Sequence, residues 1–170
     1  MDAAQRREAI LNRLREADAP LSASALAGDF SVSRQIIVGD VALLRAGGEE
    51  ISATPRGYVL AREAQGLTRT VAVKHDLAGT RQELYLLVDQ GCSVLDVVVE
   101  HAVYGQLTGE LQLHSRYDVD QFMDRLGREG NKPLSTLTEG IHLHTLRCPD
   151  EAAYERAREA LRRAGYLLED

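Results

Sequence analysis

The sequence predicts an α+β protein with two modules, a small helical one followed by an open-faced sandwich of helices on a mostly antiparallel sheet. Residues 1–62 show helical periodicity and then two short extended runs, whereas residues 63–170 alternate between strand and helix patterns. The charge divides at the same place. The first segment has eight arginines and eight acidic residues, so the second carries the whole net charge of −6. Such a division suggests two modules with different partners.

Three short helices are predicted in the first 46 residues. The first stops before Pro20, because proline cannot continue a helix, and the third stops at Gly47-Gly48. Serine residues stand where a helix cap is expected. The helices are predicted over 5–17, from a cap at Ser22 or Ser24 to Phe30, and over 34–45 behind a cap at Ser33, with Ile10, Leu11, Leu14, Ile37, Val41 and Leu44 facing inward.

Two extended runs around Pro55-Arg56-Gly57 predict a β-hairpin over 51–60. Three helices followed by such a hairpin form a winged helix-turn-helix, in which the third helix enters the major groove of DNA. The segment VSRQIIVGDVALLRA (32–46), followed by ATPRGYVL (53–60), resembles winged helices of the biotin-repressor type, in which "VSRQ" opens the recognition helix. The alternative is a small helical domain with solvated arginines.

The predicted recognition helix begins with side chains that suit base contacts. A guanidinium such as that of Arg34 can bind guanine with two hydrogen bonds, and an amide such as that of Gln35 can do the same with adenine. At the tip of the hairpin, Arg56 is expected to meet phosphate or the minor groove. The predicted DNA-binding residues are Ser33, Arg34, Gln35, Ile36 and Arg56.

After a short polar connection over 61–67, the second module reads as β-α-β-β-α-β-β-α. This order predicts helices on one face of the sheet and leaves the other face free for a ligand or partner. Asp118 and Asp150 are expected to cap the second and third helices. Strands are predicted over 68–74, 94–103, 105–113, 133–137 and 140–148, and helices over 80–90, after Asp118 and after Asp150.

All five histidines lie in this second module. His142 and His144 stand two residues apart in a predicted strand, so both imidazoles share one face, with Ile141, Leu143 and Leu146 expected on the other side. A pair of imidazoles on one face is a good start for a divalent metal site. His75 ends a predicted strand, and Glu83 lies in the first turn of the helix that follows, so these two can converge. The alternative is a pair of exposed histidines on an open sheet.

Two further features leave their role open. His101 and Tyr104 fall at a predicted turn between strands, where they can either pack a hairpin or form the wall of a ligand pocket. The only cysteines, Cys92 and Cys148, are too few for a disulfide framework or a thiolate zinc site, and they read as small buried apolar residues.

Taken together, the two modules resemble the niacin-responsive transcriptional repressors, which join a winged helix to a three-histidine (3H) domain. The resemblance covers residues 5–168 and adds to the two winged-helix segments above four segments of the second module. These are VAVKHD (71–76), ELYLLVDQG (83–91), VVVEHAVYG (97–105) and EGIHLHTL (139–146). Where the family usually has proline next to the histidine of the third segment, this chain has Ala102.

The resemblance implies more than the spacing of residues does. It implies that the 3H domain has a fold like that of the phosphocarrier protein HPr, and that nicotinic acid is a co-repressor for genes of NAD biosynthesis or niacin uptake. His101 and Tyr104 are then the predicted effector-binding residues. The implied ligands of a divalent metal, with nickel or zinc ahead of iron or manganese, are His75, Glu83, His142 and His144.

We therefore expect a homodimeric repressor that binds operator DNA, and not an enzyme. One alternative function is that of a transcription regulator with the same two modules that senses a metal or another pyridine. Another is a metal-dependent enzyme fused to a DNA anchor, which would need an acid or base such as Asp76 or Glu100 beside the metal. The charged start MDAAQRREAI and the absence of a long apolar run predict a cytoplasmic protein without a membrane partner.

Overall fold

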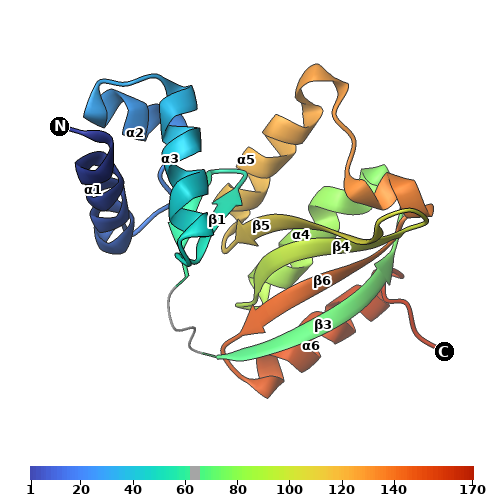
Figure 1. The fold of residues 1–170 in the computed structure, drawn as a ribbon. Coiled ribbons are helices and arrows are strands. Elements are labelled where there is room, and N and C mark those ends of the chain that lie inside the picture. The colour runs from blue at the N-terminus through green and yellow to red at the C-terminus, as the bar shows by residue number, and fades with distance from the viewer. Residues whose placement is uncertain (62–65) are drawn as a thin grey trace. The chain divides into compact units, whose positions relative to one another are not determined.

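The computed structural model describes residues 1–61 and 66–170, and the chain divides into two compact units, Met1–Glu63 and Ala64–Asp170 (Figure 1). The domain boundary predicted between residues 62 and 63 falls outside the described residues, as does most of the predicted connection. Each unit has a hydrophobic core of its own. None of the helices in the described part of the chain combines the length and apolar character needed to cross a membrane.

The first unit has the predicted three helices and hairpin. Its second helix is capped by Ser22, and not by Ser24, because the Ser22 hydroxyl accepts a hydrogen bond from the backbone N–H of Ala25 (3.0 Å). Apolar side chains from all three helices and the hairpin form the core, in which Ile10, Leu26 and Ile37 are fully buried. The elements are α1 (Ala3–Glu16), α2 (Ala23–Phe30), α3 (Arg34–Ala46), β1 (Ile51–Thr54) and β2 (Gly57–Leu60).

The hairpin turns at Gly57, whose φ of +133° favours glycine. A Cβ at this position would also lie 2.5 Å from the backbone of Leu21, which pairs with Tyr58, the next residue of β2. A larger residue at position 57 would therefore force the hairpin away from the helices.

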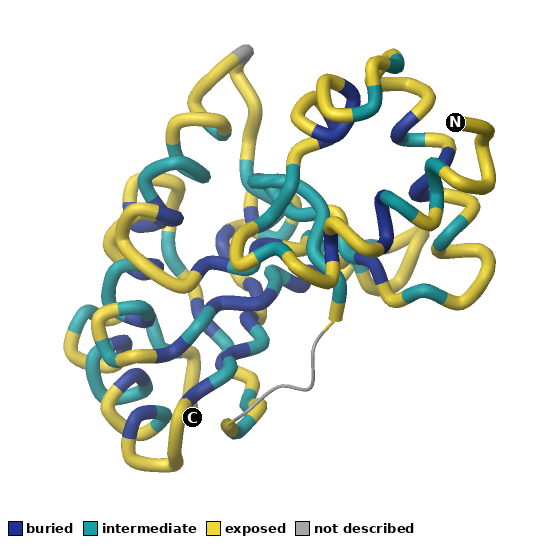
Figure 2. The backbone as a smooth tube through the Cα atoms, turned by 90° about the vertical axis from the view of Figure 1, so that its left-hand side faces the viewer, coloured by how far each residue is buried: buried dark blue, intermediate teal, exposed yellow. Residues whose placement is uncertain are grey.

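The second unit is a four-stranded sheet in the order β3-β6-β4-β5, in which every neighbouring pair is antiparallel. Helices α4 and α6 lie against one face (Figure 1), and apolar residues of the sheet pack against them to form the core. In Figure 2 the buried residues of this unit gather along its strands and on the inner sides of its helices. The elements are β3 (Leu67–Lys74), α4 (Thr80–Asp89), β4 (Ser93–His101), β5 (Gly105–Leu113), α5 (Arg116–Gly127), β6 (Ile141–Cys148) and α6 (Glu151–Arg163).

Two local predictions for this unit are wrong. The strand predicted over 133–137 is a short 3₁₀ helix, Leu134–Thr138, because the backbone and hydroxyl of Thr136 both donate to the carbonyl of Pro133 and close a tight turn. The cap of α5 is Ser115, whose hydroxyl accepts from the N–H of Asp118 (3.2 Å). The Asp118 carboxylate instead accepts from the N–H of His114 (2.8 Å), the residue before the cap.

The C-terminal residues after α6 return to the sheet along the free edge of β3. Tyr166 accepts a hydrogen bond from the N–H of Lys74 (2.8 Å), and Leu168 donates one to the carbonyl of Ala72 (2.9 Å). This short pairing covers part of an edge strand and brings the Tyr166 side chain to the end of β3.

Candidate metal centre and nucleic-acid interface

The end of β3 and the start of α4 bring a histidine and a glutamate together. His75 follows the last residue of β3, and Asp76 then caps the 3₁₀ turn Leu77–Gly79 that leads into α4. Glu83 lies in the first turn of that helix, so its side chain points back toward the end of the strand. As the sequence predicts, the two meet: Nε2 of His75 lies 2.5 Å from Oε2 of Glu83.

Strand β6 contributes two more imidazoles to the same carboxylate. Nε2 of His142 lies 3.2 Å from each oxygen of Glu83, and Nε2 of His144 lies 2.8 Å from Oε1. Glu83 is 1% exposed and the two histidines are 3% exposed, so this group is enclosed between the sheet and α4 and does not lie on the open face.

One prediction about β6 is wrong. Leu146 shares the face of the two histidines and is fully buried in the core, because it stands an even number of residues from them. Ile141 and Leu143 do lie on the opposite face, as predicted, and are 42% and 36% exposed.

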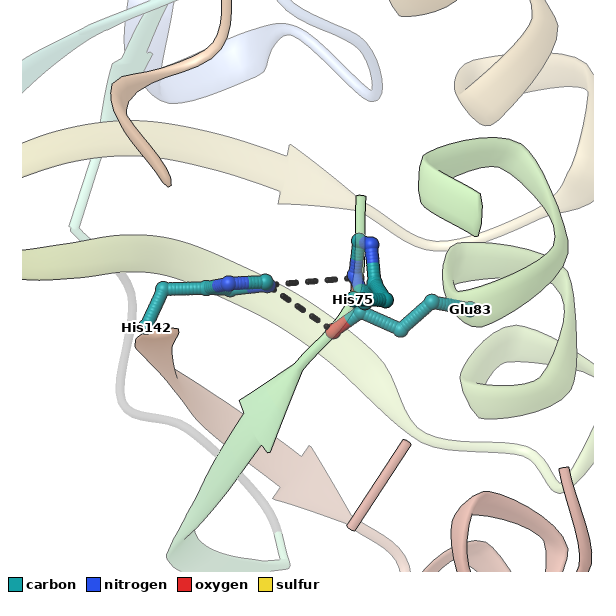
Figure 3. A group of neighbouring side chains, drawn as sticks. All are labelled: His75, Glu83 and His142. Carbon is teal, nitrogen blue, oxygen red and sulfur yellow. Dashed lines mark hydrogen bonds and ion pairs between the residues drawn. The ribbon is translucent and has the colours of Figure 1, made fainter. Parts of the chain in front are cut away.

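Figure 3 shows His75, Glu83 and His142 pointing toward one another. The ligand atoms that these three residues offer all lie within 4.8 Å of one another. The other ring nitrogen of each histidine faces a backbone carbonyl oxygen. Nδ1 lies 2.6 Å from the carbonyl of Asp76 for His75, 2.8 Å from that of Gly140 for His142, and 2.7 Å from that of Asp96 for His144. Because a carbonyl only accepts, each Nδ1 carries the proton that it donates. In its neutral form, each imidazole therefore directs the lone pair of Nε2 toward Glu83.

The three Nε2 atoms and the Glu83 carboxylate together favour a positive charge at the point where they meet. Burial alone would raise the pKa of Glu83, but the three imidazoles outweigh this effect and hold its pKa well below the usual range. Burial alone would lower the pKa of His144, yet the facing Glu83 carboxylate raises that pKa above its ordinary value. The environment thus favours an ionised carboxylate and a cationic partner over the neutral forms of both.

The residues fit a divalent transition metal. Nε2 of His144 makes no hydrogen bond to any described residue, despite its closeness to Glu83, so it is a buried acceptor in need of a partner. Metal–ligand bonds of about 2.0–2.2 Å place neighbouring ligands roughly 3 Å apart, which is the spacing found between Glu83 and the imidazoles. The Nδ1–H hydrogen bonds to carbonyls are the contacts that typically orient metal-binding histidines.

Several residues that support this site were not found from the sequence. Asp76, Gly140 and Asp96 act through backbone carbonyls, which have no residue signature. Tyr166 packs its ring 5.1 Å from that of His75 and donates its hydroxyl to Gln82 (2.6 Å). Only the topology, in which the C-terminal segment pairs with β3, brings Tyr166 here.

His101 and Tyr104 lie at the turn between β4 and β5. Nδ1 of His101 accepts hydrogen bonds from the backbone N–H groups of Val103 (3.1 Å) and Tyr104 (3.2 Å), so the histidine shapes the turn. The two rings lie 5.1 Å apart, and Tyr104 is 74% exposed. Their predicted role in effector binding stays a prediction.

A pocket of about 630 Å³ opens beside this turn, among β4, β5, β6 and the 3₁₀ helix before β6. Apolar side chains such as Val98 and Leu143 line it together with Glu100, Gln106 and Thr138. His101 and Tyr104 are not among its lining residues. Leu143, which alternates with His142 and His144, places the pocket on the sheet face opposite Glu83, but His142 is also among its lining residues.

The two cysteines are buried neighbours on β6 and at the start of β4, with their Sγ atoms 2.8 Å apart. Burial raises the pKa of Cys92 to about 12 and also raises that of Cys148. Neither is therefore a ready thiolate, in agreement with their interpretation as small buried residues.

In the first unit, the predicted DNA-binding residues lie at the start of α3 and in the hairpin. Ser33 caps α3 by accepting from the N–H of Ile36 (3.3 Å), and the residues from Ser33 to Ile36 are all exposed. Arg56 lies in the turn between β1 and β2 and is half-buried. The polar side chains Arg34 and Gln35 thus occupy the first turn of the helix, where a recognition helix reaches base edges.

An ion pair between Asp40 of α3 and Arg6 of α1 fixes the orientation of α3. Asp40 is 4% exposed, and its Oδ2 lies 2.6 Å from Nε of Arg6 on α1. Nη1 of Arg7 lies 3.6 Å from its other oxygen. The carboxylate therefore ties α3 to α1 on the side away from the exposed residues.

Comparison with known proteins agrees with both units. Residues 6–59 match the model of an HTH domain, and residues 68–170 match that of the 3H domain. The chain is 42% identical over 166 residues to "Probable transcription repressor NiaR" of Thermotoga maritima, and 42% identical over 171 residues to "Transcription repressor NadR" of Bacillus subtilis. Each alignment covers 98% of this chain and 95% of the relative. As its resemblance predicts, the chain belongs to the family of transcription repressors that join a helix-turn-helix domain to a 3H domain.

Proposed function

We propose that this protein is a nicotinic acid-responsive repressor whose 3H domain holds a divalent metal and whose α3 binds operator DNA as part of a homodimer. Its targets are genes of NAD biosynthesis or niacin uptake. The main support for the metal is that three Nε2 atoms face one buried carboxylate. Each imidazole is also held in place by a hydrogen bond between its Nδ1 and a backbone carbonyl. The repressor function rests on the two named relatives and on the HTH match.

The proposed ligands are His75, Glu83, His142 and His144, with nickel or zinc as the first candidates and iron or manganese next. A metal that takes more than four ligands keeps, beside these four, positions that a pyridine nitrogen or a carboxylate can occupy, and nicotinic acid has both. The imidazoles and Glu83 fix these positions in a buried site from which most water is excluded. His101 and Tyr104, at the turn between β4 and β5, remain candidates for contacts to the effector.

The proposed dimer follows from the number of recognition helices. A single chain supplies one α3, whereas operators for such helices have two half-sites about one DNA turn apart. The open face of the sheet is the proposed dimer surface. Its exposed Ile141 and Leu143, beside an apolar pocket, support this assignment.

The proposal is tested on purified protein by elemental analysis, gel filtration and a gel-shift assay. Operator fragments are first selected from random double-stranded DNA by the protein itself. We expect a stoichiometric transition metal, the mass of a dimer, and operator affinity that rises when nicotinic acid is added to metal-loaded protein. An affinity that stays constant over a wide range of nicotinic acid would contradict the co-repressor role, since an effector acts only through differential affinity.

The rival sensors are separated by calorimetry with nicotinate, nicotinamide and quinolinate on metal-free and metal-loaded protein. We expect nicotinate to bind the loaded form most tightly. The relatives are repressors, which favours signal binding over catalysis. Asp76, one residue considered as an acid or base, already accepts a hydrogen bond from Gly79 and caps a turn. Recovery of unaltered nicotinate after long incubation with loaded protein is the outcome we expect.

A further inference from the structure

The exposed side of α3 carries an apolar side chain in its first turn. Ile36 is 42% exposed, whereas its neighbour Ile37 is fully buried in the core. The Ile36 backbone is fixed, because its N–H donates to the Ser33 hydroxyl that caps the helix. Single exposed apolar residues are common on protein surfaces, but the place of Ile36 in the first turn of the predicted recognition helix makes it a candidate for contact with a partner outside the first unit.

The residues next to Ile36 indicate that this partner is DNA. Arg34 and Gln35 stand beside it on the same turn, and both have the hydrogen-bonding groups that read purine edges in the major groove. The major groove offers one apolar group to a protein, the C5-methyl of thymine. An exposed isoleucine next to these polar side chains is therefore suited to that methyl group.

Gly39 lies three residues after Ile36 and is also exposed. A Cβ at this position would meet no atom of the described protein within 4 Å, so packing within the molecule does not require glycine. Glycine nevertheless weakens a helix interior relative to alanine. Its advantage is that the helix backbone can approach another surface closely.

We propose that Ile36 reads the methyl group of a thymine in each operator half-site, at a place where Gly39 lets the backbone of α3 come close to the base edges. This inference rests on the proposed DNA-binding function. It assigns to Ile36 a role in sequence specificity that is distinct from the hydrogen bonds expected of Arg34 and Gln35.

The test combines a change in the protein with a change of a single methyl group in the DNA. Operators are selected from random DNA by the wild-type protein, and each thymine is then replaced in turn by deoxyuridine. At one position per half-site, we expect wild-type affinity to fall by about fourfold, the value of one buried methylene-sized group. Ile36→Ala should show no loss at that position, and Ile36→Val should show an intermediate loss.

Leu43→Ala is the matched control, because Leu43 is 59% exposed on the same helix but lies seven residues further along. Leu43→Ala should lose as much operator affinity as the wild-type protein does when that thymine is replaced by deoxyuridine. The assignment would be overturned if the replacement lowered the affinity of wild-type and Ile36→Ala protein equally. It would also be overturned if the loss of affinity disappeared in Leu43→Ala instead. Failure to enrich any operator would instead refute the proposed DNA-binding function itself.

Gly39→Ala provides a second measurement that separates DNA contact from folding. We expect this variant to raise the thermal midpoint by a few degrees, because alanine favours the helix. The same variant should bind the selected operator several-fold more weakly, because its Cβ obstructs the approach of the backbone. Unchanged or tighter operator binding by this more stable variant would overturn the role given to Gly39.

Discussion

Nε2 of His75 and Oε2 of Glu83 lie 2.5 Å apart, and the backbone of His75 is closely approached by a single glycine in the turn before β6. Gly140, just before β6, has a φ of +93°, and a Cβ there would lie 2.2 Å from the carbonyl oxygen of His75. The same residue offers its own carbonyl to Nδ1 of His142. Gly140 thus positions two of the imidazoles that face Glu83.

Gly140→Ala should therefore damage both the fold and the proposed metal site. Gly105→Ala is the matched control, because Gly105 also has a positive φ, +75°, but a Cβ there meets no described atom within 4 Å. Both variants should lose about 1–2 kcal/mol of unfolding free energy to backbone strain. Gly140→Ala should lose clearly more and should also bind less metal. Chemical denaturation and elemental analysis check this, and equal effects of the two variants would contradict it.

Removal of His142 or His144 is expected to lower the metal content without abolishing the fold. Each imidazole supplies one ligand, and the hydrophobic core lies mainly outside the cluster. The control is His114→Ala, since His114 bonds to Ser93 and lies outside the group around Glu83. Elemental analysis should show about one metal per chain for the control and much less for His142→Ala and His144→Ala. Stoichiometric metal in both of the latter would show that the site is misassigned.

Stripping the proposed metal should destabilise the second unit, because an ion that binds only the folded state stabilises it by mass action. At a free metal concentration about 100 times its Kd, the gain is about 2.7 kcal/mol. For a unit of this size, we expect the thermal midpoint to fall by about 10 °C on chelation and to recover when metal is added back. The midpoint of a His144→Ala variant should not respond to the chelator, which makes that variant the control.

The periodicity of apolar residues was enough to predict nearly every helix and strand, because those residues form the cores of the two units. The errors fell where local hydrogen bonds decide the structure. Thr136 and Pro133 make a 3₁₀ turn out of an expected strand, and Ser115 competes successfully with Asp118 for the cap of α5. Such choices depend on a few short contacts that leave no periodic signal.

The convergence of His75 and Glu83 could be predicted from the sequence because a strand end and the next helix start are close in any fold of this order. The burial of the site could not be predicted from the sequence. Strand alternation places His142 and His144 on one face, but only the position of α4 decides that this face is the covered one. The carbonyls that orient the imidazoles, and the approach of Tyr166, likewise depend on tertiary structure.

Arg34→Ala and Arg56→Ala should affect DNA binding in different ways. Arg34 stands in the first turn of α3, where a guanidinium reads a guanine edge, so its loss should cost about 1–3 kcal/mol and relax the base preference at one position. Arg56 lies in the hairpin turn, where a contact to phosphate is expected, so its loss should weaken binding to all sequences alike. Competition assays with operators changed at single positions distinguish the two. A uniform loss for Arg34→Ala would place that residue on the phosphate backbone.

Operator binding should depend on salt less steeply than it does for strongly basic repressors. Residues 1–62 have eight arginines and eight acidic residues, and part of this charge is already paired within the unit, as in Arg6–Asp40 and Arg13–Asp29. Each phosphate contact contributes about 0.9 to the slope of log K against log salt, so few contacts give a shallow slope. Titrations of one selected operator at several salt concentrations measure this slope, and Arg56→Ala should reduce it by about one unit per half-site contact. A slope near −10, as about ten phosphate contacts would produce, would mean that basic residues outside the first unit also bind the DNA.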